Sequence, residues 1–523
     1  MANRTASPDY LLRLLGFGPD DIGSTIRGFA AKGDLLLVLG RTLTCLHLIR
    51  THSMEFVALG GSEEIGASCH YVKLGEVGLL LDVGMDPDLD GEAALPHFDL
   101  ILDHPDRFVD HIIITHAHHD HLGGLIPALQ RFPHAQVHMT KATAMLADFL
   151  LGSSARLQKR RVKEGSTTTP PLFTEEEVEN YTYLFAGHEL EKPFELSGVR
   201  GGADVLATFY DAGHILGSAG VLLEYSEQGQ EKSLFFTSDT SVQHQTIIPS
   251  AVYPDGQIDT LMLESTLGAD PGAELTTRRE QEELFAQAVA ETLEEGGSVL
   301  VPVFALGRSQ EIIALIDRYK RKGVIPKDTP MYTAGSMRAI ADIYDKTRLT
   351  TPRLNEEFNV FGVEQKRLGR SPKAFERATE KPSIFLLASG MMFERTAAFD
   401  VATKLISGEK NAILFVGYAK PGCPADLVQQ AAANRNNAGL SEIEITMSSE
   451  IGPQMLRCHI DRFRFTGHAN RRDLVSIVGE LEPERVLLVH GETSARKWMK
   501  EQIETEYPDV EVFMPTQSTP LAL

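Results

Sequence analysis

The stretch THAHHDHLGG, residues 115–124, places four histidines and one aspartate within six consecutive positions. Uncharged imidazole and carboxylate are ligands that zinc prefers, with manganese or iron as alternatives. In an extended segment, alternate residues point the same way, so His116 and His118 can face one ion. Asp120 and His121 can then reach a second ion beside it. A histidine-rich surface loop is the alternative interpretation, but the density of ligands favours a metal site.

Further candidate ligands lie at the ends of other apolar, strand-like runs. His214 occurs in YDAGHILGSAG, Asp239 ends LFFTSD, and His490 ends RVLLVH. Taken singly, a histidine at a strand end is more often structural, but the repeated placement favours ligands, and the two oxygens of Asp239 could bridge two ions. Asp82 in LLLDVGMD is placed similarly, and we interpret it as a residue that orients His116 or its neighbours.

Two kinds of region must position these residues. Short apolar runs bounded by glycine predict strands from residue 54 onward, and Thr174 with Glu177 predicts a capped helix start. Thr277 and Glu280 predict a second capped helix that ends at the glycine pair 296–297. The buried runs SVLVPVF, PSIFLLASG and NAILFVGY then alternate with helical segments, which predicts an α/β domain with a mainly parallel sheet.

Composition excludes several classes of protein. The 523 residues suggest two or three domains, and the net charge of −22 means that binding a long nucleic acid would need a local basic site or a partner. Four widely spaced cysteines exclude a disulfide framework and a cysteine zinc cluster. No apolar run approaches the ~20 residues of a membrane span, and no secretory signal is evident. These features predict a cytoplasmic protein without membrane contact.

The motif order LLLDVG, THAHHDH, GHILGSA and FTSD resembles the metallo-β-lactamase superfamily. The later motifs ESTLG, PVFALGRSQE, ASGMM, FTGH and LLVHGE resemble its β-CASP nuclease branch, which includes the messenger-RNA 3′-end-processing endonuclease and ribonuclease J. The resemblance covers roughly residues 54–505. It implies an α/β fold in which an αββα sandwich, residues 54–268 and 466–523, carries an inserted β-CASP domain, residues 269–465. The active site would lie in the cleft between them.

The resemblance also implies which residues hold two zinc ions, with manganese as the alternative metal. One ion would be held by His116, His118 and His214, the second by Asp120, His121 and His490, and Asp239 would bridge both. His119 occupies a variable position of the motif and is not expected to be a ligand.

The implied activity is hydrolysis of single-stranded RNA, with DNA as the alternative substrate. A hydroxide activated by the two metals, which Asp120 helps to hold, would attack phosphorus and leave 5′-phosphate and 3′-hydroxyl ends. His468 in FTGHANRRD matches the family's general acid. Glu264 in LMLESTLG matches the carboxylate that holds the other N–H of that imidazole, although a buried salt-bridge partner is the alternative role for Glu264.

Candidate substrate-binding residues are few. Arg308 follows a glycine at a predicted helix N-terminus, where phosphate binds well, and Arg471 and Arg472 follow His468. The cationic run RLQKRRVK, residues 156–163, fits either a phosphate-binding track or a solvated helix face. The sequence departs from the family at Leu267, usually aromatic, and at residues 393–395 after ASGMM, so the shape of the substrate site is expected to differ.

Two other functions compete with the nuclease. A small ester or thioester hydrolase would share the metal core but would lack the inserted domain and would need neither Glu264 nor His468. A non-catalytic subunit of a processing or defence assembly would have lost ligands, whereas all seven matching ligands are present. Residues 1–53 form an extension, predicted as a short helix and two strands, through which a homodimer or a protein partner could bind. Internal cutting and trimming from the 5′ end both stay open.

Overall fold

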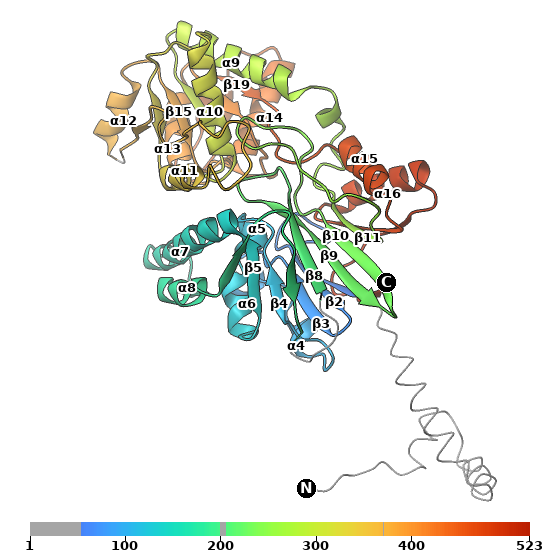
Figure 1. Ribbon diagram of the computed structural model, residues 1–523. Helices are drawn as coiled ribbons and strands as arrows, with labels where there is room; N and C mark the ends of the chain where they lie inside the picture. Colours follow the sequence, from blue (N-terminus) through green and yellow to red (C-terminus); the bar gives the residue numbers. More distant parts are fainter. Residues whose placement is uncertain (1–53, 199–204, 370) are drawn as a thin grey trace, which may run out of the picture. The chain divides into compact units, whose positions relative to one another are not determined.

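Two seven-stranded sheets form the central layers of the region that begins at Met54 (Figure 1). The computed structural model describes residues 54–198, 205–369 and 371–523, so the predictions for residues 1–53 lie outside the described residues. The strands of sheet A, in spatial order, are β22 (Leu521–Ala522), β1 (Glu55–Gly60), β2 (Cys69–Leu74), β3 (Val77–Leu81), β4 (His111–Ile113), β5 (Gln136–Thr140) and β6 (Phe185–His188).

Sheet B is built on the same plan, with a parallel part and an antiparallel part. Its spatial order is β21 (Glu511–Phe513), β20 (Arg485–Val489), β11 (Thr260–Glu264), β10 (Gln230–Phe236), β9 (Ala219–Glu227), β8 (Val205–Asp211) and β7 (Phe194–Leu196). Strands β10, β11, β20 and β21 run parallel, whereas β7 to β10 pair antiparallel. The candidate residues lie at or just after the carboxyl ends of β3 and β4 in sheet A and of β8, β10, β11 and β20 in sheet B.

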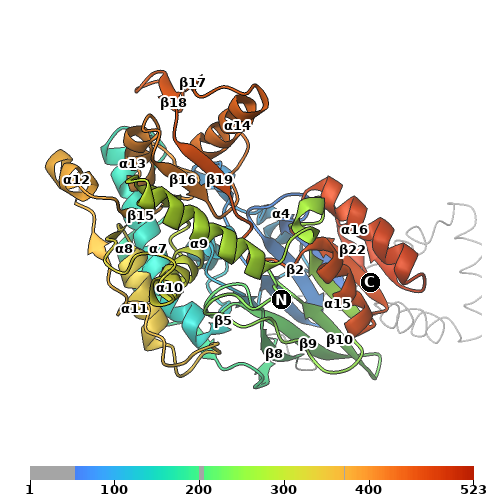
Figure 2. The same cartoon turned by 90° about the horizontal axis from the view of Figure 1, so that it is seen from above.

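Helices cover the outer faces of both sheets, which confirms the predicted αββα sandwich (Figures 1 and 2). One apolar core lies between the sheets, and a separate core joins sheet B to its own helices. The helices on the side of sheet A are α4 (Asp99–Leu102), α5 (His119–Leu122), α6 (Leu125–Arg131), α7 (Lys141–Lys163) and α8 (Glu175–Thr182), and those on sheet B are α15 (Arg471–Leu481) and α16 (Thr493–Glu506). None of the helices in the described ranges combines the length and apolar character needed to cross a bilayer.

A third sheet, sheet C, lies in the region predicted as an insertion. Its described strand pairings are all parallel, which confirms the expected mainly parallel α/β architecture. The strand order is β14 (Lys366–Arg367), β13 (Met331–Thr333), β15 (Ile384–Leu387), β12 (Val299–Pro302), β16 (Ala412–Phe415) and β19 (His459–Arg462). The helices are α9 (Arg278–Glu294), α10 (Arg308–Arg321), α11 (Met337–Lys346), α12 (Pro372–Thr379), α13 (Ala397–Leu405) and α14 (Pro424–Asn437), and a hairpin joins β17 (Ile443–Ile445) to β18 (Gln454–Leu456).

The predicted helix starts are confirmed by their hydrogen bonds. Thr174 caps α8 and Thr277 caps α9, each in a reciprocal capping box with the glutamate three residues later. Helix α10 begins after a glycine and not after a threonine cap. This glycine, Gly307, adopts a φ of +82°. A Cβ at Gly307 would lie 2.6 Å from Ile215, so both the backbone conformation and the close approach require glycine here.

Loops at the carboxyl ends of three sheet C strands contact the sandwich. The loop after β12 reaches Ile215 through Gly307. Arg395, in the loop after β15, donates a hydrogen bond of 2.8 Å to Ser166, and Lys420, in the loop after β16, forms an ion pair with Asp88. This edge of sheet C therefore faces the strand ends that carry the candidate ligands.

Three histidines form a hydrogen-bonded ladder across neighbouring strands of sheet A. His138 lies between His111 and His188, with ring nitrogens 3.0 Å apart on each side, and His111 Nε2 donates to the Ser197 carbonyl at 3.2 Å. Three neutral imidazoles satisfy the ladder, because each ring can donate to one neighbour and accept from the next. Burial, followed by the charges of the other two rings, lowers the pKa of His138 to about 3.

The ladder predicts that the fold loses stability in acid. The unfolded chain binds a proton at His138 below pH ~6.5, whereas the folded chain does not, so unfolding takes up protons and is favoured as pH falls. The expected loss from this one residue is about 2 kcal/mol at pH 5. Urea unfolding followed by circular dichroism at pH 7.5 and pH 5 should show a weaker pH dependence for His138→Gln than for the wild type. The exposed His134→Gln is the control, and equal pH dependence in all three proteins would contradict the role of the ladder.

Candidate metal centre and active site

Three of the strand ends that carry candidate residues have unusual backbone geometry. Asp82 after β3, Ser238 after β10 and His490 after β20 adopt φ values of 60°, 54° and 51°. Side-chain-bearing residues rarely occupy this left-handed region, and those that do cluster where a site imposes the conformation. The three turns project Asp82, Ser238 and His490 from the ends of strands in both sheets.

The structure brings His116, His118, His214 and Asp239 together as one group of potential ligands. His118 Nδ1 lies 3.1 Å from His214 Nε2, and Asp239 Oδ2 lies 3.6 Å from both His116 Nε2 and His214 Nε2. His116, His214 and Asp239 are buried, whereas His118 is partly exposed. These are the four residues that the family resemblance assigns to the first ion and the bridge.

A second group contains Asp120, His121 and His490. The Nε2 atoms of His121 and His490 lie 3.2 Å apart, and Asp120 Oδ2 lies 3.7 Å from His490 Nε2. Helix α5 begins directly after His118 and turns Asp120 and His121 toward this group. Asp239 Oδ2 is also 3.5 Å from His121 Nε2, so its carboxylate lies between the two groups.

The chemistry of this arrangement fits metal ions. Two pairs of imidazole nitrogens face each other at 3.1 and 3.2 Å. Among the described residues, the buried His116 Nε2 has no hydrogen-bond partner, and the buried Asp239 Oδ1 lies 3.1 Å from His490 Nδ1. Such atoms are costly to bury unless something satisfies them. Ligands about 2.1 Å from a tetrahedral zinc lie about 3.4 Å from one another, which is close to the separations observed.

Outer contacts fix the orientation of the rings. His214 Nδ1 donates to the Gly467 carbonyl at 2.8 Å, and His121 Nδ1 donates to Asp82 Oδ2 at 2.8 Å, which leaves each Nε2 lone pair free for an ion. The sequence placed Asp82 beside His116 or its neighbours, and the structure places it on His121. Hydroxyl groups that the sequence did not single out lie beside His116 Nδ1: Thr115 Oγ1 at 3.2 Å and Ser238 Oγ at 3.3 Å.

The electrostatics of the cluster favour neutral imidazoles in the group of His116 and His214, and they favour ionised carboxylates at Asp239 and Asp120. Burial lowers the pKa values of His116 and His214. Burial opposes ionisation of Asp239, but the charges of His490 and His121 outweigh it and hold the pKa of Asp239 well below its usual range. For His490, burial is likewise outweighed, in that case by Asp239 and Asp120, and its pKa rises to about 10.

His468 and Glu264 form a pair beside the first group. His468 Nδ1 lies 3.1 Å from Glu264 Oε2, and the His468 ring lies 4.6 Å from that of His214. Glu264 is completely buried and also accepts the backbone N–H of Thr240 at 2.7 Å. Burial disfavours protonation of His468, but the charges of Glu264 and Asp239 outweigh it and raise its pKa. Because Nδ1 is engaged by Glu264, Nε2 is the atom left to meet a substrate.

Two residues that sequence reasoning missed hold the loop that carries His214. Gln245 Nε2 donates to the His214 carbonyl at 2.6 Å and to the Gly213 carbonyl at 2.9 Å. The next residues, 246–248, each donate a backbone N–H to the buried carboxylate of Glu311 on α10. Glu311 therefore ties the inserted region to a loop that positions a candidate ligand. It lies in the motif PVFALGRSQE, but nothing in the motif indicates its long-range partners.

Arg308 begins α10, as the sequence predicted, next to Gly307. A Cβ on Gly307 would lie 4.0 Å from His118 Nε2, so the start of this helix lies beside the donor cluster. Arg308 Nη1 is buried and has no hydrogen-bond partner in the described structure, and burial together with the charge of Arg278 lowers the pKa of Arg308 to about 9. An anionic ligand would supply the missing partner, and the assignment of Arg308 to substrate stays a prediction.

The other predicted cations have structural partners. Arg471 and Arg472 both form ion pairs with Glu274, and both lie over the ring of Trp498, at 4.1 and 5.0 Å from its centroid. The Trp498 contacts join α15 to α16, and the ion pairs join α15 to the segment before α9 that contains Glu274. Substrate binding by the two arginines stays a prediction. The cationic run 156–163 forms the end of α7, where Arg156 and Arg161 pair with acidic residues, which favours the solvated-face interpretation.

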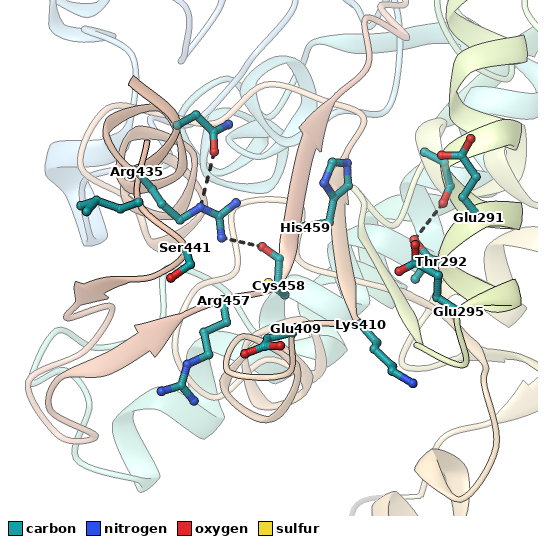
Figure 3. Close-up of a pocket in the computed structure, with 13 residues that line it drawn as sticks. Glu291, Thr292, Glu295, Glu409, Lys410, Arg435, Ser441, Arg457, Cys458 and His459 are labelled. Carbon is teal, nitrogen blue, oxygen red and sulfur yellow. Dashed lines mark hydrogen bonds between the residues drawn. The ribbon is translucent and has the colours of Figure 1, made fainter. Parts of the chain in front are cut away.

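A cavity of about 390 Å³ lies elsewhere, near the amino ends of β16 and β19 (Figure 3). Acidic and basic side chains line it together. Arg435 donates to the Cys458 carbonyl at 2.9 Å, and Arg457 pairs with Glu442. The cavity is thus at the opposite edge of sheet C from the loops that face the donor cluster.

Comparison with known families agrees with this arrangement. Residues 63–261 match the metallo-beta-lactamase superfamily, residues 309–427 match the Beta-Casp domain, and residues 454–515 match the Zn-dependent metallo-hydrolase RNA specificity domain. The chain belongs to the β-CASP branch of the metallo-β-lactamase superfamily. The third stretch of this β-CASP chain contains both His468 and His490.

Similar curated proteins include two fungal enzymes and an archaeal factor. Endoribonuclease ysh-1 of Neurospora crassa is 30% identical over 499 residues, 88% of this chain and 55% of that protein. Endoribonuclease YSH1 of Gibberella zeae is 28% identical, covering 84% of this chain and 53% of that protein. Transcription termination factor FttA of Methanocaldococcus jannaschii is 29% identical, covering 83% and 66%. The β-CASP chain spans about half the length of the two fungal relatives.

Among solved structures, a protein of unknown function from Enterococcus faecalis V583 has a similar fold. It aligns with 90% of this β-CASP chain and 100% of its own, with a TM-score of 0.50 and 14% sequence identity. At this identity the likeness concerns the fold alone.

Proposed function

We propose that this chain is a metal-dependent phosphodiesterase that cleaves single-stranded RNA. The observation that carries the proposal is the His468–Glu264 pair, placed directly against a double group of histidine and aspartate ligands. A small-ester hydrolase would need the metal ligands but not a proton donor held in this way. A leaving 3′-oxygen of RNA does need one, because the alkoxide is a poor leaving group unless it is protonated.

The two groups of ligands would hold two divalent ions, zinc or manganese. Such ions activate water and offset the negative charge that gathers on a phosphodiester during its hydrolysis. Glu264 holds Nδ1 of His468 and, with Asp239, favours the protonated ring, so that Nε2 can deliver a proton to the 3′-oxygen. The products would carry 5′-phosphate and 3′-hydroxyl ends. Arg308, at the N-terminus of α10, is placed to bind a neighbouring phosphate.

The relatives support RNA as the substrate. Two of them are named endoribonucleases, and the family that matches residues 454–515 is described as an RNA specificity domain. We therefore favour RNA over DNA, although the chain's net charge of −22 means that affinity must come from a local site rather than from the general surface.

A cleavage assay tests the proposal. Single-stranded RNA and DNA of equal sequence, each labelled at one end, are incubated with the full chain after treatment with chelator and after addition of zinc or manganese. We expect metal-dependent cleavage of RNA, with fragments that carry a 3′-hydroxyl. Fragments of intermediate length indicate internal cutting, whereas early release of the labelled terminal nucleotide from RNA labelled at its 5′ end indicates trimming from that end. Absence of cleavage of both polymers by the metal-loaded protein would overturn the proposal in favour of an ester hydrolase or a non-catalytic subunit.

A further inference from the structure

Aromatic side chains are exposed at the edge of sheet C that faces the metal centre. Phe304 follows β12, Phe393 follows β15 and Tyr418 follows β16, with 37%, 48% and 50% of their surfaces exposed. Burying a large aromatic side chain is strongly favourable in free energy. Three exposed rings on loops at the same edge of one sheet therefore indicate a binding surface. Each of these loops also contacts the sandwich, as described above, which places the rings at the boundary of the two regions.

Phe304 and Tyr418 are neighbours on this edge. The Phe304 ring lies against two glycines: a Cβ added to Gly390 would lie 3.5 Å from the ring, and one added to Gly417 would lie 3.6 Å from it. Gly417 directly precedes Tyr418. At these two positions the glycines place no side chain against Phe304. Two partly exposed rings, Phe304 and Tyr418, therefore lie on the loops that follow the neighbouring strands β12 and β16.

The same surface borders the candidate active site on two sides. The loop of Phe304 continues to Gly307, whose Cβ position is 4.0 Å from His118 Nε2. The loop of Tyr418 is held beside the loop that follows β3, because Lys420, two residues later, forms an ion pair with Asp88. Strand β3 is the strand that Asp82 follows, and Asp82 accepts a hydrogen bond from the candidate ligand His121. Both rings are therefore within reach of a polymer whose phosphate lies in the metal centre.

We propose that Phe304 and Tyr418 form a stacking platform for unpaired nucleobases next to the phosphodiester that is cleaved. The proposal rests on the proposed function and adds a binding site for the bases of the substrate. Aromatic stacking on bases needs no positive charge and tolerates any base sequence. It would give affinity to a strongly acidic chain in which Arg471 and Arg472 are held by Glu274. Double-stranded nucleic acid, whose bases are already stacked, would not benefit.

The test compares RNA with and without bases at the same positions. Binding is measured for a single-stranded RNA and for the same RNA with abasic residues within three nucleotides of the mapped cleavage bond, using the His468→Ala protein to prevent turnover. In that background, Phe304→Ala and Tyr418→Ala should each raise the Kd for the intact RNA about tenfold. The abasic RNA should bind weakly to the His468→Ala protein in which Phe304 and Tyr418 are intact. Phe304→Ala and Tyr418→Ala should change the Kd for the abasic RNA by less than about twofold.

Controls separate stacking from structural damage. Phe361 is an exposed aromatic residue that lies before the amino end of β14, with 44% of its surface exposed, so Phe361→Ala should leave the Kd unchanged. Tyr418→Phe and Phe304→Trp keep a ring and should bind intact RNA within about twofold of the parent. Equal losses for intact and abasic RNA, or no loss at all, would overturn the platform while cleavage of RNA still upheld the nuclease. Failure of the wild-type chain to bind or cleave RNA would overturn both.

Discussion

Replacement of His468 by alanine is expected to lower the rate of RNA cleavage by about 10²–10⁴-fold, the usual contribution of a general acid. The expectation follows from geometry. Glu264 lies 3.1 Å from Nδ1 of His468, which leaves Nε2 as the proton donor. The charges of Glu264 and Asp239 outweigh burial and raise the pKa of the His468 ring. Metal content should not change, because His468 belongs to neither group of ligands. Single-turnover cleavage, with metal analysis of the same samples, checks both statements.

Two further variants sharpen this prediction. His459→Ala removes an exposed histidine at the opposite edge of sheet C and should cleave at the wild-type rate. Glu264→Gln keeps a hydrogen-bonding partner for His468 but removes the charge that favours its protonated form. A group with a raised pKa stays protonated up to a higher pH, so losing that charge should move the alkaline fall of kcat/KM to lower pH. An unchanged rate for His468→Ala would mean that the proton comes from another donor.

The sequence could predict that the candidate ligands lie together, because strand ends converge by topology. Apolar runs that end in aspartate or histidine are visible in the sequence, and parallel strands bring such ends to one edge of a sheet. His116, His214, Asp239 and His490 follow four strands of two sheets and meet in the structure. The strained turns at Asp82 and His490 are the local cost of that convergence, and sequence patterns did not indicate them.

Contacts between residues far apart in the chain were harder to predict. Asp82 was predicted to orient His116 or its neighbours, and it does accept hydrogen bonds from His121 and Thr115. Which neighbour it contacts depends on how α5 turns after His118, and the sequence does not indicate that turn. Glu311 binds backbone N–H groups about 65 residues earlier in the chain, at positions 246–248, and no spacing rule identifies backbone donors in a loop. Arg471 follows His468 closely in sequence, but the first turn of α15 directs it to Glu274 and Trp498 instead.

Asp120→Ala is expected to reduce bound metal from the proposed two ions per chain to one or none. It is also expected to lower RNA cleavage to below ~10⁻³ of the wild-type rate, because in the proposed mechanism both water activation and charge neutralisation depend on the ions. The side chain can be removed without breaking the local fold. The backbone of Asp120, not its carboxylate, accepts the N–H of Ser68 at 2.7 Å and packs against Gly84. The Asp120 carboxylate lies 3.9 Å from His121 Nε2 and 3.7 Å from His490 Nε2. Burial alone would raise the pKa of Asp120, but the charge of His121 outweighs burial and lowers it.

The adjacent His119 supplies a matched control for this loss. It lies in the same helix and the same motif, is exposed, and belongs to neither ligand group. His119→Ala should therefore retain both ions and the wild-type rate, although it removes a histidine from a histidine-rich segment. If the two variants lost metal equally, the segment would be binding ions as a flexible, histidine-rich loop. If Asp120→Ala kept full metal content and activity, the second ion would have no role in the reaction, and the chemistry would have to be assigned to the group of His116, His118, His214 and Asp239 alone.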